Sequence, residues 1–198
     1  MIFLQRNSYM KILLTFFILF FSYSVIADDI SEFKIEGISI GDSLLEHMSE
    51  NEINKNMTDL YNYIDEKKFI TTGFFSKDLT SDFDFIQVTL KINDDQYEVY
   101  GVGGNISPID PPECLIKQKE IDNDINGNFS DFEKFGPITA PHPVDGGKSV
   151  VHQISYKLNK GGAALIECYD FSNAVPYEDS FVLSLYSDEL NQWLQKYQ

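Results

Sequence analysis

The chain has 198 residues, of which 43% are hydrophobic and 14% aromatic, and its formal net charge is −16. This length predicts a single domain, and the apolar content excludes a disordered acidic tail, because such tails lack the apolar surface needed to fold. The acidic excess argues against nucleic acid and against an anionic membrane surface as partners, since both recruit patches of Lys and Arg.

The N-terminal residues have the pattern of a secretory signal peptide. Lys11 precedes an almost unbroken apolar run from Ile12 to Phe21, and Val25 and Ala27 then occupy the −3 and −1 positions before Asp28. A basic start, an apolar stretch of about 7–15 residues and small residues before the cleavage site define such signals. We therefore expect export, with cleavage before Asp28.

Two details of this segment refine the expectation. The apolar run is shorter than the about 20 residues of a membrane span, so a retained N-terminal anchor is the weaker alternative. Met10 opens a more ordinary signal peptide than Met1 does, so we expect translation to begin at Met10. The mature protein is then a periplasmic or secreted single domain over residues 28–198, without membrane attachment.

Removal of the signal peptide makes the net charge of the chain more negative. Residues 28–198 carry 13 lysines, no arginine and all 31 acidic residues, which gives a net charge of −18. Without arginine the chain lacks the planar fork that binds phosphate or carboxylate through two hydrogen bonds. Nucleic-acid binding and phosphoryl transfer are therefore disfavoured, and a cationic partner or a divalent cation is the more natural ligand. An AT-rich genome explains the preference for lysine better than a function does.

Residues 28–198 contain two cysteines, Cys114 and Cys168. In an oxidising compartment such a pair most often forms a disulfide, and closing a loop of about 55 residues is worth roughly 4 kcal/mol. The alternative is a catalytic thiol assisted by His47, His142 or His152, but neither cysteine lies in a nucleophile motif. We therefore expect one structural disulfide.

Alternating apolar and polar residues predict strands, and apolar residues three or four positions apart predict helices. In chain order these patterns predict a strand at 33–40, a helix at 43–64, a short strand near 69–75, a hairpin of strands 83–92 and 97–106, a helix at 111–125, a loop at 126–148, strands at 150–158 and 163–171, a strand at 181–186 and a final helix through Leu194. The first helix is placed at Ser43 because Ser43 and Glu46 fit a capping box.

The strands arrive in hairpins rather than alternating singly with helices. This arrangement predicts an α+β fold with a mainly antiparallel sheet. The main elements give the order β-α-β-β-α-β-β-β-α, with two to three helices and one disulfide.

The sharpest motif is a calcium-loop pattern at residues 122–133, D-x-[DN]-x-[DN]-G-x5-E, which the chain satisfies in full. A hard cation prefers about six to eight oxygen ligands, and Gly127 permits the sharp turn that gathers them. The candidate ligands are Asp122, Asp124, Asn126, Asn128, Ser130 and Glu133.

The flanks of this motif favour a different interpretation. Lys117 and Gln118 stand where the entering helix of a calcium-binding pair is usually apolar, and Gly136-Pro137 stops any exiting helix. The sequence has no second loop to pair with the first. An acidic helix end followed by an Asn-Gly turn is therefore the stronger interpretation, and Ca²⁺ remains the one candidate cofactor.

Two further motifs have structural explanations. Gly101-Val-Gly-Gly104 lies in a hairpin strand rather than in a βαβ unit, so it predicts a bulge or a close backbone approach and not a nucleotide site. His142 with Asp145, and His152 in a strand, lack the spacing of a metal pair on one helix. A hydrolase built on His142 and Asp145 is kept as a third hypothesis.

The segments from Asp29 to Leu45, from Tyr97 to Gly104 and from Glu167 to Asp170, together with Cys114, are similar to a group of uncharacterised exported proteins of marine alphaproteobacteria. The resemblance covers most of residues 28–198 through short sequence words. It implies export and supports pairing of the two cysteines, and it implies no activity.

The export signal is accompanied by no convergent nucleophile, base or cofactor loop in the sequence. We therefore expect a binding or interaction protein rather than an enzyme. The expected partner of this binding protein is another protein or a small molecule. The second hypothesis is a Ca²⁺-dependent module that uses residues 122–133.

Overall fold

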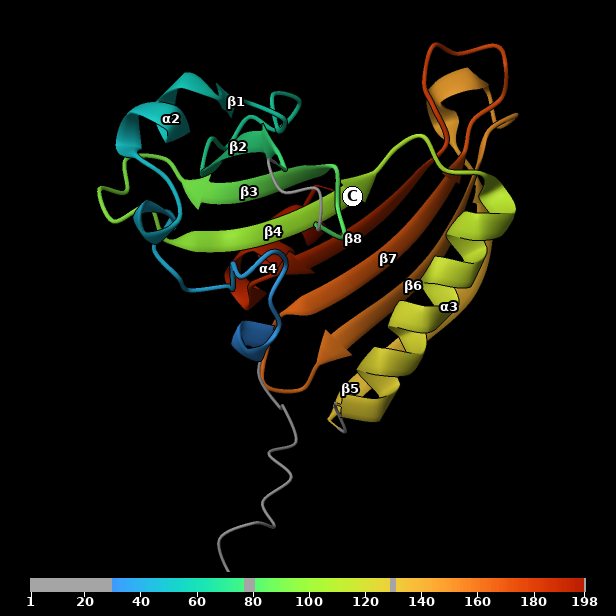
Figure 1. Ribbon diagram of the computed structural model, residues 1–198. Coiled ribbons are helices and arrows are strands. Elements are labelled where there is room, and N and C mark those ends of the chain that lie inside the picture. Colours follow the sequence, from blue (N-terminus) through green and yellow to red (C-terminus); the bar gives the residue numbers. More distant parts are fainter. Residues whose placement is uncertain (1–29, 77–80, 129–130, 198) are drawn as a thin grey trace, which may run out of the picture.

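A computed structural model describes residues 30–76, 81–128 and 131–197. The expected signal peptide, its cleavage site before Asp28, the Met10 start and Ser130 lie outside these residues. Within them the chain forms one antiparallel sheet of eight strands and three α-helices, which confirms the α+β class (Figure 1). The strand order across the sheet is β1-β2-β3-β4-β8-β7-β6-β5.

The strands are β1 (Met57–Thr58), β2 (Phe69–Phe75), β3 (Phe85–Lys91), β4 (Val99–Ile106), β5 (Phe132–Pro141), β6 (Val150–Leu158), β7 (Ala163–Asp170) and β8 (Ser180–Tyr186). The α-helices are α2 (Glu50–Lys55), α3 (Pro111–Asn128) and α4 (Asp188–Gln195). Short 3₁₀ helices are η2 (Ile30–Glu32), η3 (Leu44–Glu46) and η4 (Pro143–Asp145).

Two antiparallel meanders build the sheet and meet at its centre. Strands β1 to β4 follow one another in chain order on one side, and β5 to β8 do so on the other. The meanders join where β4 pairs with β8, from Gly101 opposite Tyr186 to Ile106 opposite Phe181. The residues of β4 and β8 therefore occupy the middle of the sheet.

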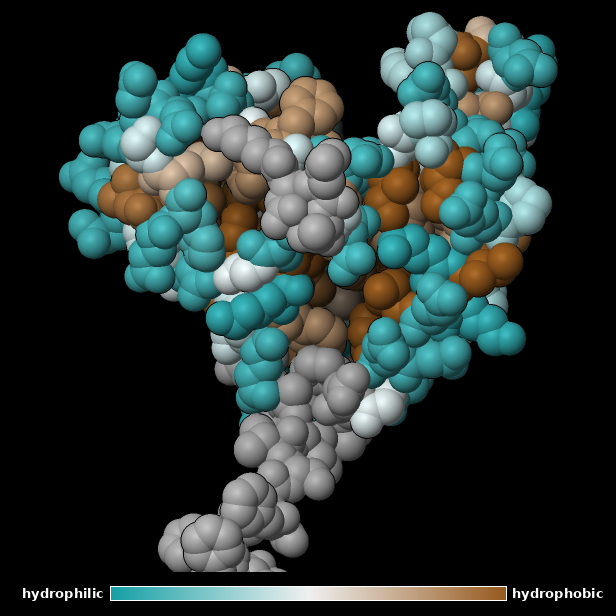
Figure 2. Space-filling view, viewed as in Figure 1, coloured by the Kyte–Doolittle hydropathy of each residue, from teal (hydrophilic) through white to brown (hydrophobic). Residues whose placement is uncertain are grey.

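Alternation of side chains along each strand gives the sheet a buried core face. Ile86, Val88 and Leu90 of β3 are buried on this face, where the segment 30–55 packs against them. Helix α3 covers the same face and contacts β7 and β8; in Figure 1 it runs alongside β6 on the β5 side of the sheet. In the same view, Figure 2 shows that the outer surface of α3 is mostly hydrophilic, as expected of a helix between a sheet and solvent.

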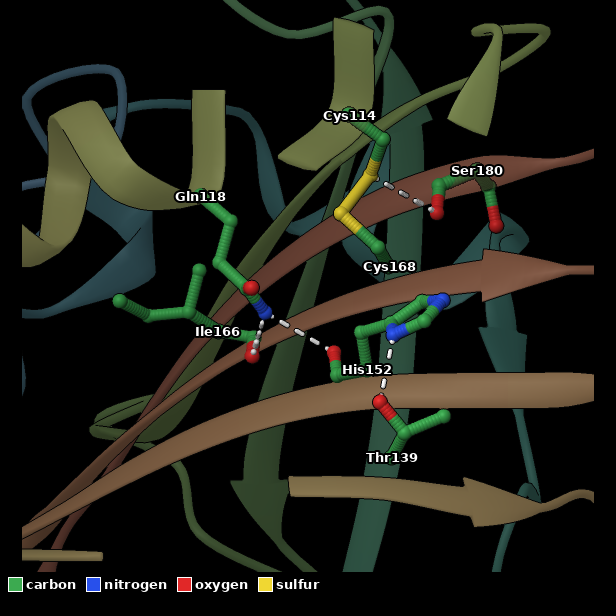
Figure 3. The surroundings of a disulfide bond; sticks show 7 residues. All are labelled: Cys114, Gln118, Thr139, His152, Ile166, Cys168 and Ser180. Carbon is green, nitrogen blue, oxygen red and sulfur yellow. Dashed lines mark hydrogen bonds between the residues drawn. A yellow bond between two sulfur atoms is a disulfide. The ribbon is translucent and has the colours of Figure 1, made fainter. Parts of the chain in front are cut away.

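A disulfide and a buried amide fasten α3 to the core face. Cys114 in α3 and Cys168 in β7 are bonded, which confirms the expected pairing. One turn further along α3, the Nε2 atom of buried Gln118 donates hydrogen bonds to the carbonyl oxygens of His152 (2.9 Å) and Ile166 (3.1 Å), as Figure 3 shows. A buried amide needs such acceptors to avoid a desolvation penalty. The first half of α3 is thus fastened to the sheet by a covalent bond and by hydrogen bonds.

Helix α4 packs on the opposite face of the sheet, which we call the outer face. Ser187 caps this helix by accepting a hydrogen bond from the backbone N–H of Leu190 (3.2 Å). The buried ring of Trp193 contacts the rings of Tyr61 and Phe69 edge-on. Among the described residues, this second apolar cluster includes one end each of β2, β4 and β8 on the outer face.

The residues expected to form the first strand, 33–40, make a tight turn instead. Ile35 and Ile38 pair with each other across this turn, in which Glu36 and Gly37 have φ values of 50° and 82°. Both isoleucines are buried. The apolar alternation therefore indicates burial here, without the extended backbone that usually accompanies it.

The helix expected at 43–64 is much shorter than predicted. A capping box does form, but at Ser49 and Glu52 rather than at Ser43, whose side chain caps no helix. Helix α2 starts after Ser49 and ends at Lys55, and the chain then passes into β1.

Strand β5 occupies part of the expected loop 126–148. Its pairing with β6 is irregular between Phe135 and Ile138, around Gly136 and Pro137. Gly and Pro usually indicate turns in a sequence. Because Gly136 and Pro137 lie within β5, the sequence pattern predicted a loop here instead of a strand.

Candidate functional site

Side chains on the outer face form rows that run across the strands, because cross-strand partners project from the same face. One row consists of Phe75, Phe85, Asn105, Val182, Glu167, Gln153 and Ile138. The next row consists of Gly73, Gln87, Gly103, Ser184, Leu165, Ser155 and Phe135.

Large apolar side chains stand at both ends of the first row and at the β5 end of the second, whose β2 end is Gly73. Phe75 on β2 is 74% exposed, and Phe135 and Ile138 on β5 are 50% and 53% exposed. Between these ends, the central strands contribute mostly glycine, serine, asparagine and glutamine. Small side chains between larger ones leave the middle of the outer face hollow.

A cleft of about 190 Å³ lies in this hollow. It runs along β3 from Phe85 to Thr89, a length of about 13 Å at roughly 3.3 Å per residue. Strands β3, β4 and β8 line it, together with Tyr61 from the segment before β2. Volume and length suit a ligand with one ring rather than a large cofactor.

Three glycines of β4 line the cleft, and two of them make room for neighbouring parts of the protein. A Cβ atom on Gly101 would lie 2.7 Å from Cδ2 of Leu190, so this glycine lets α4 approach the sheet. A Cβ atom on Gly104 would collide with the ring of Phe83. These contacts confirm the close backbone approach expected for this glycine-rich strand.

The third glycine, Gly103, has no such packing role. The nearest atoms to a Cβ at this position would be the carbonyl oxygen of Leu183 and the hydroxyl of Ser184, both at 3.3 Å. Its outer face belongs to the cleft. Gly103 therefore leaves the floor of the cleft bare, so that a flat group can approach the backbone closely.

Aromatic rings stand at both ends of the cleft. At one end the hydroxyl of Tyr61 lies 3.3 Å from Oγ1 of Thr89, and burial raises the pKa of Tyr61 although this hydrogen bond opposes the shift. At the other end the ring of Phe85 packs edge-on against Phe75, with 5.1 Å between the ring centroids. Rings in these positions can contact both ends of an apolar ligand.

Neutral polar groups complete the lining. The amides of Gln87 and Asn105 and the hydroxyl of Ser184 offer both hydrogen-bond donors and acceptors. Among the described residues that line the cleft, none is Asp, Glu, His, Lys or Cys. The lining can therefore orient a ligand, but it supplies no pair of nucleophile and base.

One carboxylate, that of Glu167 in β7, lies beside the cleft on the same face. Glu167 stands directly opposite Val182, which lines the cleft. Its side chain is half-buried, and the hydroxyl of Tyr169 donates a hydrogen bond to its Oε2 atom at 3.0 Å. Burial raises the pKa of Glu167, and the hydrogen bond from Tyr169 offsets only part of this shift.

Two tyrosines share the surroundings of this carboxylate. Burial raises the pKa of both Tyr169 and Tyr186, and the negative charge of Glu167 raises them further. Tyr186 itself lines the cleft. Raised pKa values for an acid and for two phenols indicate that this margin of the cleft is poor in water.

The structure does not fold residues 122–133 into the expected calcium loop. Asp122, Asp124, Asn126 and Asn128 lie in the last turns of α3, and β5 begins at Phe132. Helix α3 covers the core face, whereas Glu133 projects from β5 to the outer face opposite Lys157. The structure thus agrees with the favoured acidic helix end, whereas the Asn-Gly turn expected at 126–127 is part of α3. Calcium binding stays a prediction that would require α3 to unwind.

Asp122 has other partners in this structure. It accepts a hydrogen bond from the hydroxyl of Tyr156 and forms an ion pair with Lys134. Burial disfavours the charge of Asp122, but Lys134, Tyr156 and Asn126 together lower its pKa. These contacts tie the end of α3 to β5 and β6. Among the described residues, no three His, Cys, Asp or Glu side chains are arranged to hold a metal ion.

The carboxylate of Asp145 accepts hydrogen bonds that stabilise a turn, and it is not paired with His142 as the hydrolase hypothesis requires. It accepts hydrogen bonds from the backbone N–H (2.9 Å) and hydroxyl (2.8 Å) of Ser149 and from the hydroxyl of Ser172 (2.5 Å). These hydrogen bonds lower the pKa of Asp145 well below its ordinary value. The carboxylate therefore holds the segment after η4 against the loop that follows β7.

The histidines have separate structural contacts. The Nδ1 atom of His142 accepts a hydrogen bond from the backbone N–H of Val144 (3.3 Å). The ring of His152 contacts the hydroxyl of Thr139 at 2.8 Å on the core face (Figure 3). Both cysteine sulfurs are in the disulfide. The described residues thus form no hydrolytic group around His142 and no catalytic thiol.

Sequence reasoning missed Glu167 as a site residue. The available signal is the strand Ala163–Asp170, in which Leu165, Glu167 and Tyr169 share one face. A carboxylate between two large side chains of the same face is unusual for a buried or half-buried strand.

Among the described helices, none is long and apolar enough to cross a membrane. Comparison with protein-family models, with curated proteins and with solved structures finds no match for this chain.

Proposed function

We propose that the protein is an exported, non-catalytic binding protein that holds a small organic ligand in the cleft on the outer face. The observation that supports this most strongly is the bare floor at Gly103, which lies between the aromatic ends at Tyr61 and Phe85. Ligand sites typically combine an apolar, concave surface with a few polar groups that fix orientation.

The physical fit favours a flat, mostly apolar ligand with one polar end. A ring can lie on the backbone of β4, because a glycine carries no side chain that would keep it away. Gln87, Asn105 and Ser184 can then hydrogen-bond to its polar group. The absence of a nucleophile and base among the described lining residues supports binding without catalysis.

Export is supported by two observations of different kinds. The sequence predicts a cleavable signal peptide that ends at Ala27. The disulfide Cys114–Cys168 is of the kind that persists in oxidising compartments. The binding protein is thus proposed to act in the periplasm or outside the cell.

An NMR titration with the neutral single-ring probe 2-phenylethanol tests the proposed function. We expect millimolar probe to shift the backbone amide signals of Gly101, Gly103 and Gly104 in a saturable way. The variant Gly103→Ala adds a methyl group to the floor of the cleft, so its affinity for the probe should fall roughly tenfold, which corresponds to about 1.4 kcal/mol.

Gly127→Ala is the matched control. A Cβ atom at Gly127 in α3 meets nothing within 4 Å, so the same change there fills no cleft. The affinity of this variant should equal that of the unmodified protein. Probe-induced shifts that avoid the three cleft glycines, or equal affinities for the two alanine variants, would contradict the proposed function.

A further inference from the structure

We propose that the ligand of this cleft is a small organic cation, whose ammonium group pairs with Glu167 while its apolar body lies over β4. This inference rests on the proposed function and names the class of ligand. The observation behind this inference is the half-buried carboxylate of Glu167 beside the cleft. A neutral ligand would not need this charge, whereas a cation would pair with it.

The carboxylate of Glu167 is incompletely satisfied by the protein itself. An ionised carboxylate offers about four lone-pair sites for hydrogen bonds. The structure shows one side-chain donor, the neutral hydroxyl of Tyr169 at 3.0 Å. A carboxylate removed from water is favourable only when a positive charge or several donors compensate it.

The ion pairs of four described lysines are made with other carboxylates. Lys67, Lys68, Lys91 and Lys134 pair with Asp59, Glu189 or Asp122. Lys157 lies on the same face of β6, but four residues along the strand from Gln153, the cross-strand partner of Glu167. That separation is about 13 Å, which is too far for an ion pair.

The position of Glu167 matches a ligand that occupies the cleft. Glu167 and Asn105 flank Val182 on the two neighbouring strands, and strands are spaced about 4.8 Å apart. The backbone of Glu167 therefore lies roughly 10 Å from the backbone of β4. The carboxylate is turned along β7 toward Tyr169, so a ring over β4 with a two-carbon arm and an amine reaches it when the glutamate side chain rotates toward Val182.

Charge complementarity supports the choice of a cation. The chain carries a net charge of −16, so its field attracts cations. An anionic ligand would meet the charge of Glu167 without any positive group among the described residues that line the cleft.

A second acidic region on the surface is the natural competitor for a cation. Asp110, Glu113 and Glu178 line an open recess between the start of α3 and the loop after β7. All three side chains are exposed, so water and salt screen their charges. Glu178→Gln removes the same unit of charge as Glu167→Gln, and it is the matched control for a general effect of net charge.

The test compares three probes of similar size: 2-phenylethylamine, the neutral 2-phenylethanol and the anionic 3-phenylpropanoate. Their affinities are measured by NMR titration on the unmodified protein, on Glu167→Gln and on Glu178→Gln. We expect the amine to bind the unmodified protein at least tenfold more tightly than the alcohol, and the anion to bind most weakly. In Glu167→Gln the amine should bind no better than the alcohol, whose affinity is unchanged.

Each alternative result has a definite meaning. Equal affinities for amine and alcohol in the unmodified protein, or a preference that survives Glu167→Gln, would overturn the cation inference while leaving the cleft as a neutral site. A preference lost in Glu178→Gln would overturn it too, by placing the amine in the acidic recess. If no probe shifts the cleft glycines, the proposed function itself fails. The amide spectrum of Glu167→Gln without probe shows whether that variant is folded.

Discussion

The half-buried charge of Glu167 does not contribute to the stability of the fold. Its burial raises its pKa above the ordinary value of 4.5. An acid with a raised pKa binds its proton more tightly in the folded state than in the unfolded state. Above the raised pKa the buried charge therefore lowers the stability of the folded protein; this penalty fades as the pH falls from the raised pKa toward 4.5 and is lost below that value. Such a penalty is typical of residues kept for a function.

We predict that Glu167→Gln raises the free energy of unfolding at pH 7. The gain should shrink as the pH falls through the raised pKa and vanish near about pH 3.5, where Glu167 is protonated in both states. The amide oxygen of glutamine can still accept the hydrogen bond from Tyr169. Urea denaturation of both proteins at the two pH values measures the difference.

The control for this prediction is Glu178→Gln, because Glu178 is exposed. Its stability should stay within about 0.5 kcal/mol of the unmodified protein at either pH. A loss of stability at pH 7 in Glu167→Gln would show that the folded chain itself compensates this charge. The case for an external cation would then disappear.

The contacts of individual residues could be predicted from the sequence only where the residue type itself indicates the partner. Cys114 and Cys168 are such a case, because two cysteines in a chain with a predicted export signal imply each other. Gly103 and Glu167 are not, because their meaning depends on which strands become neighbours. The chain separates them by a helix and two further strands, and the sheet then leaves only β8 between their strands.

At the scale of elements, the disulfide and α3 act as one unit. Cys114→Ala combined with Cys168→Ala removes the covalent tie between α3 and β7. We predict that this double variant loses about 4 kcal/mol of unfolding free energy, because the unfolded chain regains the freedom of a loop of roughly 55 residues. Denaturant titration under non-reducing conditions measures the loss.

The cleft should survive this change, because its lining comes from β3, β4, β8 and Tyr61 and not from α3. The double variant should therefore still bind 2-phenylethanol under conditions in which it remains folded. A loss of stability below about 1 kcal/mol would contradict the assigned role of the disulfide.

Elements with regular patterns were predicted well, and irregular ones were not. The hairpin of β3 and β4, the pair of β6 and β7, and helices α3 and α4 all lie close to their expected residues. Strand β5 was missed because Gly136 and Pro137 interrupt its pairing with β6. The acidic helix end favoured for residues 122–125 agrees with α3, but the turn expected at Asn126-Gly127 does not form, because α3 continues to Asn128.

At the scale of the whole molecule, the two faces of the sheet are covered unequally. Segment 30–55 and α3 bury the core face, whereas among the described residues α4 covers only one end of the outer face. The remaining outer face has exposed apolar residues at its two margins and the cleft at its centre. Exposed apolar surface around a concave centre is typical of binding sites. The strong negative charge of the chain then favours cationic ligands.

A crystal structure of the protein with 2-phenylethylamine tests this assignment most directly. We predict that the ring lies over Gly101–Gly104, between Tyr61 and Phe85, and that the amine nitrogen lies within about 3 Å of the carboxylate of Glu167. A ring bound instead in the acidic recess beside Glu113 and Glu178, or anywhere away from the outer face, would contradict it.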